Sequence, residues 1–491
     1  MRVRSALVVV LCAGFAAGAA APADRTSHVT SCGRGLVLTV GSNREYPRIT
    51  DALAAARRLR LAAGELERAR TPVCIDVAAG TYVGSFDPAV LGANPGYEAL
   101  PLVLDVPNVS VRGVTELVLD ERNRPLRVGA NVTRLVADPP AADNMQPYFL
   151  VAPTERQRGL SIVRSRGNRA TIEGFVLDFA VCGAGGGRCA EGGRCEPRDD
   201  CRFTQRGTGI WTHGIDDYLL RGNVAIGGGY GVQHSFSSGR TIRNLLMHNA
   251  LVGIVYRGPA RTNALVRENT STHNSLGGMA VACSAGNFPL PALDHEPGVA
   301  VVPGPVDGSL HATQVELDTN DFSHHTGAQD FSFGLRILMF GPQPLTPDRT
   351  TCRVTAQRNR MIDTTFGIVN DAGFPYATVD GRSVGTAWTA RYRASYRRNE
   401  VDGDTEDVLV SLTRFTSTRD CRELDSGLPT SFRFLRQSTY SIRHSGELGT
   451  MCRDNRELDP ATREPLGNEL RVGRVSLEGL TCKPITPCAQ Q

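Results

Sequence analysis

Two adjacent aspartates near the middle of the chain have the residue types of an acid–base pair. Asp216 and Asp217 end the segment His213-Gly214-Ile215-Asp216-Asp217. Paired carboxyl groups hydrolyse glycosidic bonds, because one activates water while the other protonates the leaving oxygen. An aspartate that precedes a strand is also ordinary turn chemistry. The segment therefore predicts either two catalytic aspartates or a structural turn.

The densest acidic cluster of the chain lies further along. Glu316, Asp318 and Asp321 occur within one short segment, and Asp330 follows closely. Ca²⁺ prefers several carboxylate or carbonyl oxygens in a flexible cage. The first three residues therefore predict a calcium site, and the alternative is a solvated acidic surface. No other cofactor is implied.

A glycine followed by an aliphatic residue recurs at a nearly fixed interval. The mark is found at Gly209-Ile210, Gly231-Val232, Gly253-Ile254 and Gly278-Met279, with steps of 22, 22 and 25 residues. The short aliphatic runs between the marks predict strands, because none is long enough for an apolar helix face. A period in this range indicates one structural unit stacked on itself. Short strands in such turns predict a parallel β-helix, since a leucine-rich repeat would need regularly placed leucines.

Asparagines recur in phase with the glycine marks. Stacked asparagines at tight turns hydrogen-bond along a ladder. We therefore expect a structural role for the residues at these positions, Asn223, Asn244, Asn249, Asn269 and Asn274.

Strand alternation places further polar residues on one outer face. Side chains in a strand point alternately to its two faces. If the aliphatic residue of each mark points inward, the following residue points outward. One outward column then contains Trp211, Gln233, Val255, Ala280, Arg336 and Val369, and the next contains His213, Ser235, Arg257, Ala282, Leu338 and Asp371.

This outer face has the side chains of an acidic-sugar site. A guanidinium binds a carboxylate through two hydrogen bonds, and an aromatic ring packs on a sugar ring. The alternative is an ordinary solvated surface. The predicted substrate-binding residues are Trp211, His213, His234 and Arg336, and the predicted catalytic residues are Asp216, Asp217, Arg257 and Asp330.

The N-terminal part of the chain carries a family resemblance. Tyr46 to about Arg70 predicts a helix whose first turn Thr50 or Asp51 can cap. A strand and a Gly-Thr-Tyr turn follow up to Tyr82, and then a strand that reads Asn-Val-Ser-Val-Arg-Gly. Over roughly residues 38–120 this order resembles the pectin-lyase-like superfamily of right-handed β-helix proteins. The resemblance implies that the helix closes one end of the stack and shields unpaired strand edges.

The resemblance also implies chemistry on polyuronates. Pectate lyases hold Ca²⁺ on carboxylates and remove a proton with an arginine, a role open to Arg257 or Arg336. The segment around Asp330 is similar to that of the pectin methylesterase nucleophile, and Asp216-Asp217 is similar to part of the polygalacturonase pattern. The companion motifs of both are missing. No Arg-Ile-Lys can occur in the body of the protein, because Lys483 is the only lysine.

The termini and the cysteines predict an exported protein. Residues 1–23 have the basic start, apolar stretch and Ala-x-Ala ending of a signal peptide. No second apolar stretch is long enough to cross a bilayer. Of the 13 cysteines, Cys12 falls in this peptide, which leaves an even number for disulfides. We expect a secreted protein, either extracellular or periplasmic.

The expected fold class is all-β. We predict a right-handed parallel β-helix solenoid with an N-terminal capping helix and a disulfide-bonded C-terminal extension. The β-helix would cover residues 30–400, with loop insertions at about 182–206 and 284–312. A cysteine-containing cap would follow at residues 401–491.

Composition limits the partners. The net charge is only +4, and the sequence has no cluster of basic and aromatic residues that would predict a nucleic-acid interface. We expect a monomer that binds an acidic polysaccharide, with no nucleic-acid or membrane partner. The predicted function is a carbohydrate-active enzyme, a pectin or polyuronate lyase or hydrolase. The alternative is a non-catalytic secreted or cell-surface protein for polysaccharide binding or adhesion.

Overall fold

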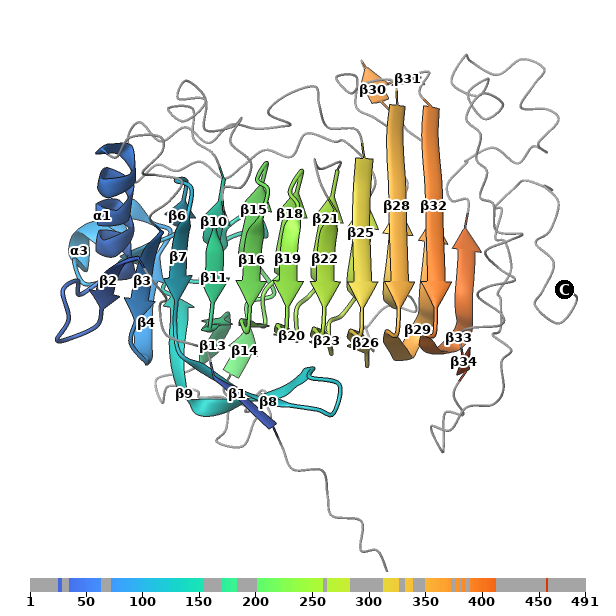
Figure 1. Cartoon of the computed structure of the whole chain (residues 1–491), viewed down its shortest axis with the longest axis horizontal. Coiled ribbons are helices and arrows are strands. Elements are labelled where there is room, and N and C mark those ends of the chain that lie inside the picture. The colour runs from blue at the N-terminus through green and yellow to red at the C-terminus, as the bar shows by residue number, and fades with distance from the viewer. Residues whose placement is uncertain are drawn as a thin grey trace, which may run out of the picture.

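The protein, analysed as a computed structural model, is built around a long stack of parallel strands (Figure 1). The structure describes residues 25–28, 35–62, 72–152, 169–182, 201–258, 263–282, 312–325, 332–338, 349–371, 377–379, 382–384, 389–411 and 456–457. The predicted signal peptide, residue Asp330 and most of the predicted C-terminal cap lie outside these residues. The same holds for nearly all of both predicted loop insertions.

Three parallel sheets run along the stack, and the chain visits them in turn. The first sheet contains β6 (Leu102–Leu104), β10 (Pro147–Val151), β15 (Thr208–His213), β18 (Tyr230–Ser235), β21 (Val252–Arg257), β24 (Gly277–Ala282), β27 (Phe333–Leu338) and part of β29 (Arg360–Asp371). The second sheet contains β2 (Leu36–Val40), β3 (Val73–Val77), β7 (Val109–Arg112), β11 (Thr171–Glu173), β16 (Tyr218–Arg221), β19 (Gly239–Ile242), β22 (Ala264–Arg267), β25 (Ala312–Asp318), β28 (Arg349–Gln357) and β32 (Thr389–Arg397).

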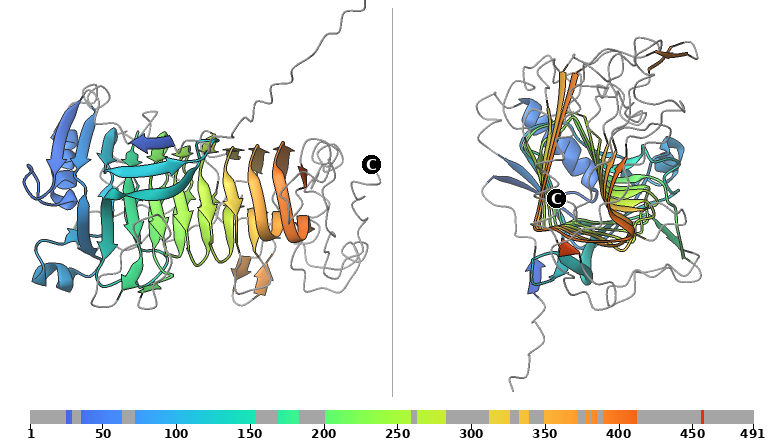
Figure 2. Two further views of the ribbon diagram at one scale, coloured as in Figure 1. Left: turned by 90° about the horizontal axis from the view of Figure 1, so that it is seen from below. Right: turned by 90° about the vertical axis from the view of Figure 1, so that its right-hand side faces the viewer.

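The third sheet contains β4 (Gly80–Ser85), β9 (Pro125–Ala137), β12 (Phe175–Asp178), β17 (Val224–Ile226), β20 (Leu245–Met247), β23 (Thr270–Thr272) and β26 (Asp321–Ser323). It joins the first sheet through the long strands β29 and β33 (Glu400–Ser411), and β34 (Arg456–Glu457) pairs with β33. This arrangement confirms a parallel β-helix, seen side-on and end-on in Figure 2. Its last long strand reaches Ser411, past the boundary expected at residue 400.

The strand register confirms the period predicted from the glycine marks. Ile210, Val232, Ile254 and Met279 are direct partners in successive strands. A Cβ atom added to Gly231 would lie 2.7 Å from the carbonyl oxygen of the next marker glycine, Gly253. One added to Gly253 would lie 1.9 Å from the hydroxyl oxygen of Ser271. The mark therefore arises because the chain passes too close to its neighbours for any side chain.

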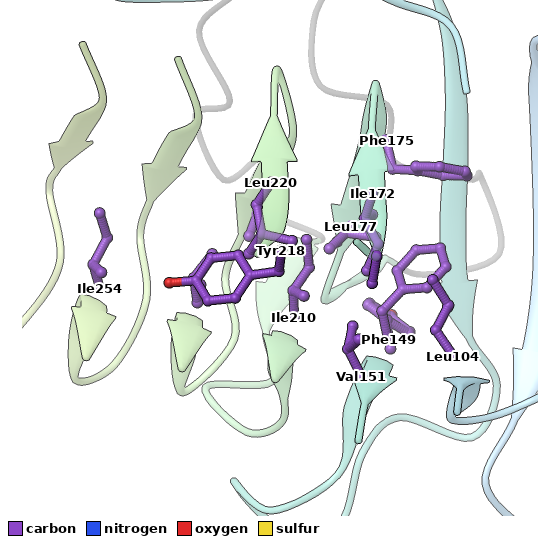
Figure 3. Close-up of a cluster of buried hydrophobic side chains, with 14 of the residues drawn as sticks. Leu104, Phe149, Val151, Ile172, Phe175, Leu177, Ile210, Tyr218, Leu220 and Ile254 are labelled. Carbon is purple, nitrogen blue, oxygen red and sulfur yellow. The ribbon is translucent and has the colours of Figure 1, made fainter. Parts of the chain in front are cut away.

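The interior of the stack is filled by large apolar side chains. Phe149, Phe175, Ile210 and Leu220 are fully buried and lie together between the sheets (Figure 3). Burial of each of these side chains stabilises the fold by about 1.5–3 kcal/mol. This core is therefore the main source of stability.

The predicted asparagine ladder is present and longer than the repeats indicated. Successive side-chain amides donate to the next Oδ1 at 2.8–3.1 Å along Asn223, Asn244, Asn269, Asn320, Asn359 and Asn399. A shorter ladder joins Asn249 to Asn274, and the backbone N–H of Asn274 donates to His325 Nδ1 at 3.2 Å. Burial lowers the pKa of His325 to about 3, so this imidazole is a neutral acceptor.

Helix α1 (Ile49–Ala62) lies at the N-terminal end of the stack (Figure 1). Its buried face, which includes Ile49, Ala52 and Ala56, belongs to the same core as β2 and β3. The expected cap at Thr50 or Asp51 is wrong. The carboxylate of Glu98, in β5 (Glu98–Ala99), accepts from the backbone N–H groups of Ile49 at 2.7 Å and Thr50 at 2.8 Å. A carboxylate distant in sequence thus satisfies the free amides at this positive helix end.

Antiparallel strands cover the outer face of the third sheet. β1 (Arg25–His28) pairs with β8 (Thr115–Leu119), which pairs with β9. Leu117 and Leu119 of β8 pack on Val224 and Leu245 of the third sheet. Both views in Figure 2 show this layer on the side of the stack.

Smaller elements complete the described part of the chain. Helix α3 (Pro88–Ala93) and the hairpins β13 (Ala180–Cys182)–β14 (Cys201–Phe203) and β30 (Ala377–Val379)–β31 (Arg382–Val384) lie beside the stack. Cys74 of β3 forms a disulfide. None of the described helices is both long and apolar enough to span a bilayer.

Candidate functional site

The outer face of the first sheet carries the two columns predicted from strand alternation. Trp211 is the direct partner of Gln233, which pairs with Val255, and the column continues through Ala280 and Arg336. The neighbouring column runs from His213 through Ser235 and Arg257 in the same register. The structure therefore brings three predicted site residues onto one face, with Trp211 and His213 on β15 and Arg257 on β21, and with β18 between these two strands. Arg336 lies two strands further along.

This face is more closed than a solvated surface. Trp211 and His213 are fully buried. The indole packs on Val103 and Leu150, and its Nε1–H donates to Ser235 Oγ at 3.1 Å. The imidazole of His213 lies edge-on between the rings of Trp211 and Phe236. The rings of Trp211 and His213 are therefore packed into this face and are not exposed on it.

His234 does not belong to this face, and its predicted substrate-binding role is wrong. Its ring points into the core and stacks between Tyr218, at 4.7 Å, and Tyr256, at 4.3 Å. Its ring nitrogens are hydrogen-bonded to Thr212 Oγ1 at 2.7 Å and Thr241 Oγ1 at 3.1 Å. Burial lowers the pKa of His234 to about 3. Because side chains alternate along a strand, His234 points to the opposite face from its neighbour Gln233. The lowered pKa makes its imidazole a neutral group of the core.

Gln233 is the residue that the sequence analysis left out of the predicted site. Its side chain is fully buried, and neither Oε1 nor Nε2 has a hydrogen-bond partner among the described residues. A buried amide without partners costs about 1–3 kcal/mol, so native proteins rarely keep one without a reason. Its place between Trp211 and Val255 in the outward column was the available signal. This amide can both donate to and accept from one ligand.

Aromatic rings hold the two arginines of the face. The guanidinium of Arg257 lies 5.3 Å from the ring centroid of Tyr230 and donates to its hydroxyl oxygen at 3.0 Å. The guanidinium of Arg336 lies 5.7 Å from the ring centroid of Phe333. Both arginines are half-buried. Contact with a ring orients each guanidinium fork, and this planar fork is the group that recognises a carboxylate.

The predicted catalytic aspartates lie at the edge of this face. Asp216 and Asp217 are in the turn between β15 and β16, and Asp216 Oδ1 accepts from Ser238 Oγ at 2.7 Å. Asp217 is exposed and adopts a left-handed backbone conformation, with φ of 59°. The hydrogen bond joins Asp216 to the corner that follows β18, so Asp216 lies two turns of the stack from the corner that follows Arg257. Asp217 has the geometry of a turn residue.

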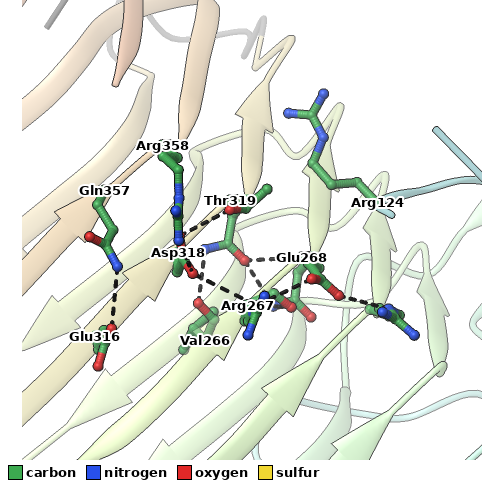
Figure 4. Close-up of polar contacts among 12 residues, drawn as sticks. Arg124, Val266, Arg267, Glu268, Glu316, Asp318, Thr319, Gln357 and Arg358 are labelled. Carbon is green, nitrogen blue, oxygen red and sulfur yellow. Dashed lines mark hydrogen bonds and ion pairs between the residues drawn. The ribbon is translucent and has the colours of Figure 1, made fainter. Parts of the chain in front are cut away.

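The three carboxylates predicted to bind calcium do not converge. Glu316 and Asp318 lie on β25 of the second sheet, whereas Asp321 lies on β26 of the third sheet. Arg358 binds both oxygens of Asp318 at 2.7 Å (Figure 4). Arg124 lies 3.6 Å from Asp321. Guanidinium groups thus occupy the places where a cation would bind. Among the described residues, no group of three or more acidic, histidine or cysteine side chains could hold a metal ion.

The strand pairing and this face define a parallel β-helix protein with a partly apolar, arginine-bearing outer sheet. No family model and no curated protein matches the chain. Among solved structures it is similar to a DFA-IIIase mutant from Arthrobacter chlorophenolicus A6 in complex with DFA-III. That match has 11% identity and a TM-score of 0.34, over 80% of this chain and 79% of that chain.

Two further solved structures are similar at a comparable level. The pectate lyase Pel9A matches with 11% identity and a TM-score of 0.23, over 90% of each chain. ORF18 of Geobacillus virus E2 matches with 11% identity and a TM-score of 0.27, over 69% of this chain and 54% of that chain.

Proposed function

We propose that the protein is an exported, carbohydrate-active β-helix protein that recognises an acidic polysaccharide on the outer face of its first sheet. The observation that carries the proposal is the buried amide of Gln233, for which the described part of the chain provides no hydrogen-bond partner. Gln233 lies between its strand partners Trp211 and Val255. Arg257 is on the same strand as Val255, two residues further along. Such a group is expected where a ligand supplies the missing partners.

The chemistry around Gln233 selects a sugar acid over other ligands. A side-chain amide matches a sugar hydroxyl, because each has a donor and an acceptor. Arg257, held on the ring of Tyr230, supplies the charge that a uronate carboxylate needs. Trp211 contributes apolar surface and burial, which lowers the local dielectric and strengthens both contacts.

Within this proposal the protein is a lyase or hydrolase in which Arg257 acts at the end of β21 and Asp216 acts two turns of the stack away, after β15. Non-catalytic binding is the second candidate. The observation that favours it is that Asp216 already accepts from Ser238 and that Asp217 has the geometry of a turn residue. Recognition by Gln233 and Arg257 is common to both candidates.

The remaining expectations belong to the same proposal. The disulfide of Cys74 supports an oxidising compartment and hence export. The apolar face of α1, which joins the core at the end of the stack, supports a capping role for this helix. We retain right-handed coiling and a monomeric state as parts of the proposal.

The test is a calorimetric titration of the mature, oxidised protein with oligogalacturonate, beside a neutral oligosaccharide. We expect binding of the acidic ligand and a loss of at least tenfold in affinity for Gln233→Met. Because Met removes the unpartnered amide, the same variant should gain about 1–3 kcal/mol in unfolding free energy.

Gln357→Met is the matched control, since Gln357 lies on the second sheet and donates only a 3.4 Å hydrogen bond to Glu316. It should change neither quantity appreciably. Unchanged affinity in Gln233→Met, or a large loss of its stability, would mean that the amide serves the fold and not a ligand.

A further inference from the structure

The outer face of the second sheet and the corner beside it carry a stripe of arginines. Carboxylates lie beneath them, and Figure 4 shows the central part of the stripe. The described arginines of this stripe are Arg112, Arg221, Arg240, Arg243, Arg267, Arg353, Arg358 and Arg398, and the described carboxylates among them are Asp76, Glu173, Glu268, Glu316 and Asp318. The arginine stripe therefore has an excess of positive charge.

The geometry places the positive charge outermost. Glu268 is nearly buried, and it pairs with Arg243 at 2.7 Å and with Arg267 at 3.2 Å. The side chain of Asp318 is 7% exposed, whereas that of its partner Arg358 is 51% exposed. Two arginines thus share each of these buried carboxylates, and the guanidinium groups face solvent.

Three arginines of the stripe have no such partner. Arg240, Arg353 and Arg398 are exposed, and no described side chain pairs with them. Arg240 and Arg353 lie on the outer face of the second sheet, and Arg398 lies at the corner just after β32. Glu316 is the one exposed carboxylate among the described residues of the stripe, and Gln357 contacts it.

We propose that the arginine stripe is a second binding surface, which holds the carboxylates of an acidic polysaccharide along the stack. Neighbouring rungs are about 4.8 Å apart, which is comparable to the length of one sugar unit. The stripe already binds carboxylates with paired arginines at Glu268 and Asp318. A guanidinium fork favours this planar group, and a polymer gains affinity by engaging many weak contacts at once.

This surface lies on a different sheet from Gln233, so it goes beyond the site proposed above. The first sheet would select a sugar unit within a closed face. The arginine stripe would concentrate the polymer through long-range attraction, which salt screens.

The test compares polygalacturonate binding by the wild type, by a triple variant Arg240→Gln, Arg353→Gln and Arg398→Gln, and by Gln233→Met. The triple variant should fold normally, because none of the three side chains makes a described contact. We expect its affinity at low salt to fall about tenfold and its binding to become less sensitive to salt. The control variant Arg58→Gln, Arg127→Gln and Arg206→Gln removes equal charge outside the stripe and should bind as the wild type does.

The outcomes separate the two sites. Oligogalacturonate too short to span the stripe should bind the triple variant normally and Gln233→Met weakly, which would support both proposals. Equal loss in the triple variant and its control would overturn the stripe, because net charge alone would then explain binding. Stronger binding of polyphosphate than of polygalacturonate would also overturn it, since the surface would then recognise phosphate.

Discussion

The marker glycines and Gln233 on the first sheet have different physical origins. The marker glycines are needed because a Cβ atom at these strand positions would collide with neighbouring atoms. Gln233 is a large buried polar group that no described residue hydrogen-bonds. Packing alone explains the glycines, whereas we propose that a ligand explains the glutamine.

The packing explanation can be tested with Gly253→Ala. Its methyl group would lie 1.9 Å from Ser271 Oγ, a separation that forces Ser271 on strand β23 to move. Overpacking of this kind costs about 1–3 kcal/mol. We expect that loss in urea unfolding. Gly96→Ala is the control, because a Cβ atom there meets nothing within 4 Å, and the explanation fails if both variants unfold alike.

Residue types alone could not place the imidazoles or the carboxylates. His234 and Gln233 are adjacent in sequence, yet one faces the core and the other the outer side. Glu316, Asp318 and Asp321 are close in sequence, yet a corner of the stack separates the last from the other two. Their spacing along the chain predicted one acidic cluster. The corner that separates its members is a feature of the three-dimensional fold, which spacing alone does not reveal.

At the scale of the strand and its turn, the asparagine ladder fixes the corners of the stack. Asn269 accepts from the backbone and side-chain N–H groups of Asn244, both at 2.9 Å, and donates to Asn320 Oδ1 at 2.9 Å. Each amide thus joins three rungs. The repeats predicted this feature well, because the asparagines recur with the glycine marks.

Asn269→Ala should destabilise the protein by about 3 kcal/mol. The substitution leaves the buried backbone N–H of Asn244 without its acceptor, whereas Asn244 Nδ2 still donates to Leu220 O and Ile242 O. It also removes the hydrogen bonds that Asn269 Nδ2 donates to Thr241 O and Asn320 Oδ1. Each buried group left unsatisfied costs about 1–3 kcal/mol. Thermal and urea unfolding would measure the loss. Asn131→Ala, at an exposed position of β9, should stay within about 0.5 kcal/mol. A loss below 1 kcal/mol in Asn269→Ala would mean that water replaces the ladder.

At the scale of the whole molecule, the three outer faces differ. β1 and β8 cover the third sheet, the arginine stripe runs along the second sheet, and the first sheet carries Gln233 among aromatic and arginine side chains. The parallel β-helix followed from a period that every rung repeats. The β1–β8 layer was not predicted, because it occurs once and carries no repeat.

The direct test of the central claim is mass spectrometry of polyuronates after incubation with the mature, oxidised protein, with neutral polysaccharides as controls. We predict fragments from acidic polymers only, unsaturated for a lyase or hydrated for a hydrolase, and their loss in Arg257→Ala. Intact acidic polymers together with no measurable binding would contradict the claim that this face recognises acidic polysaccharide.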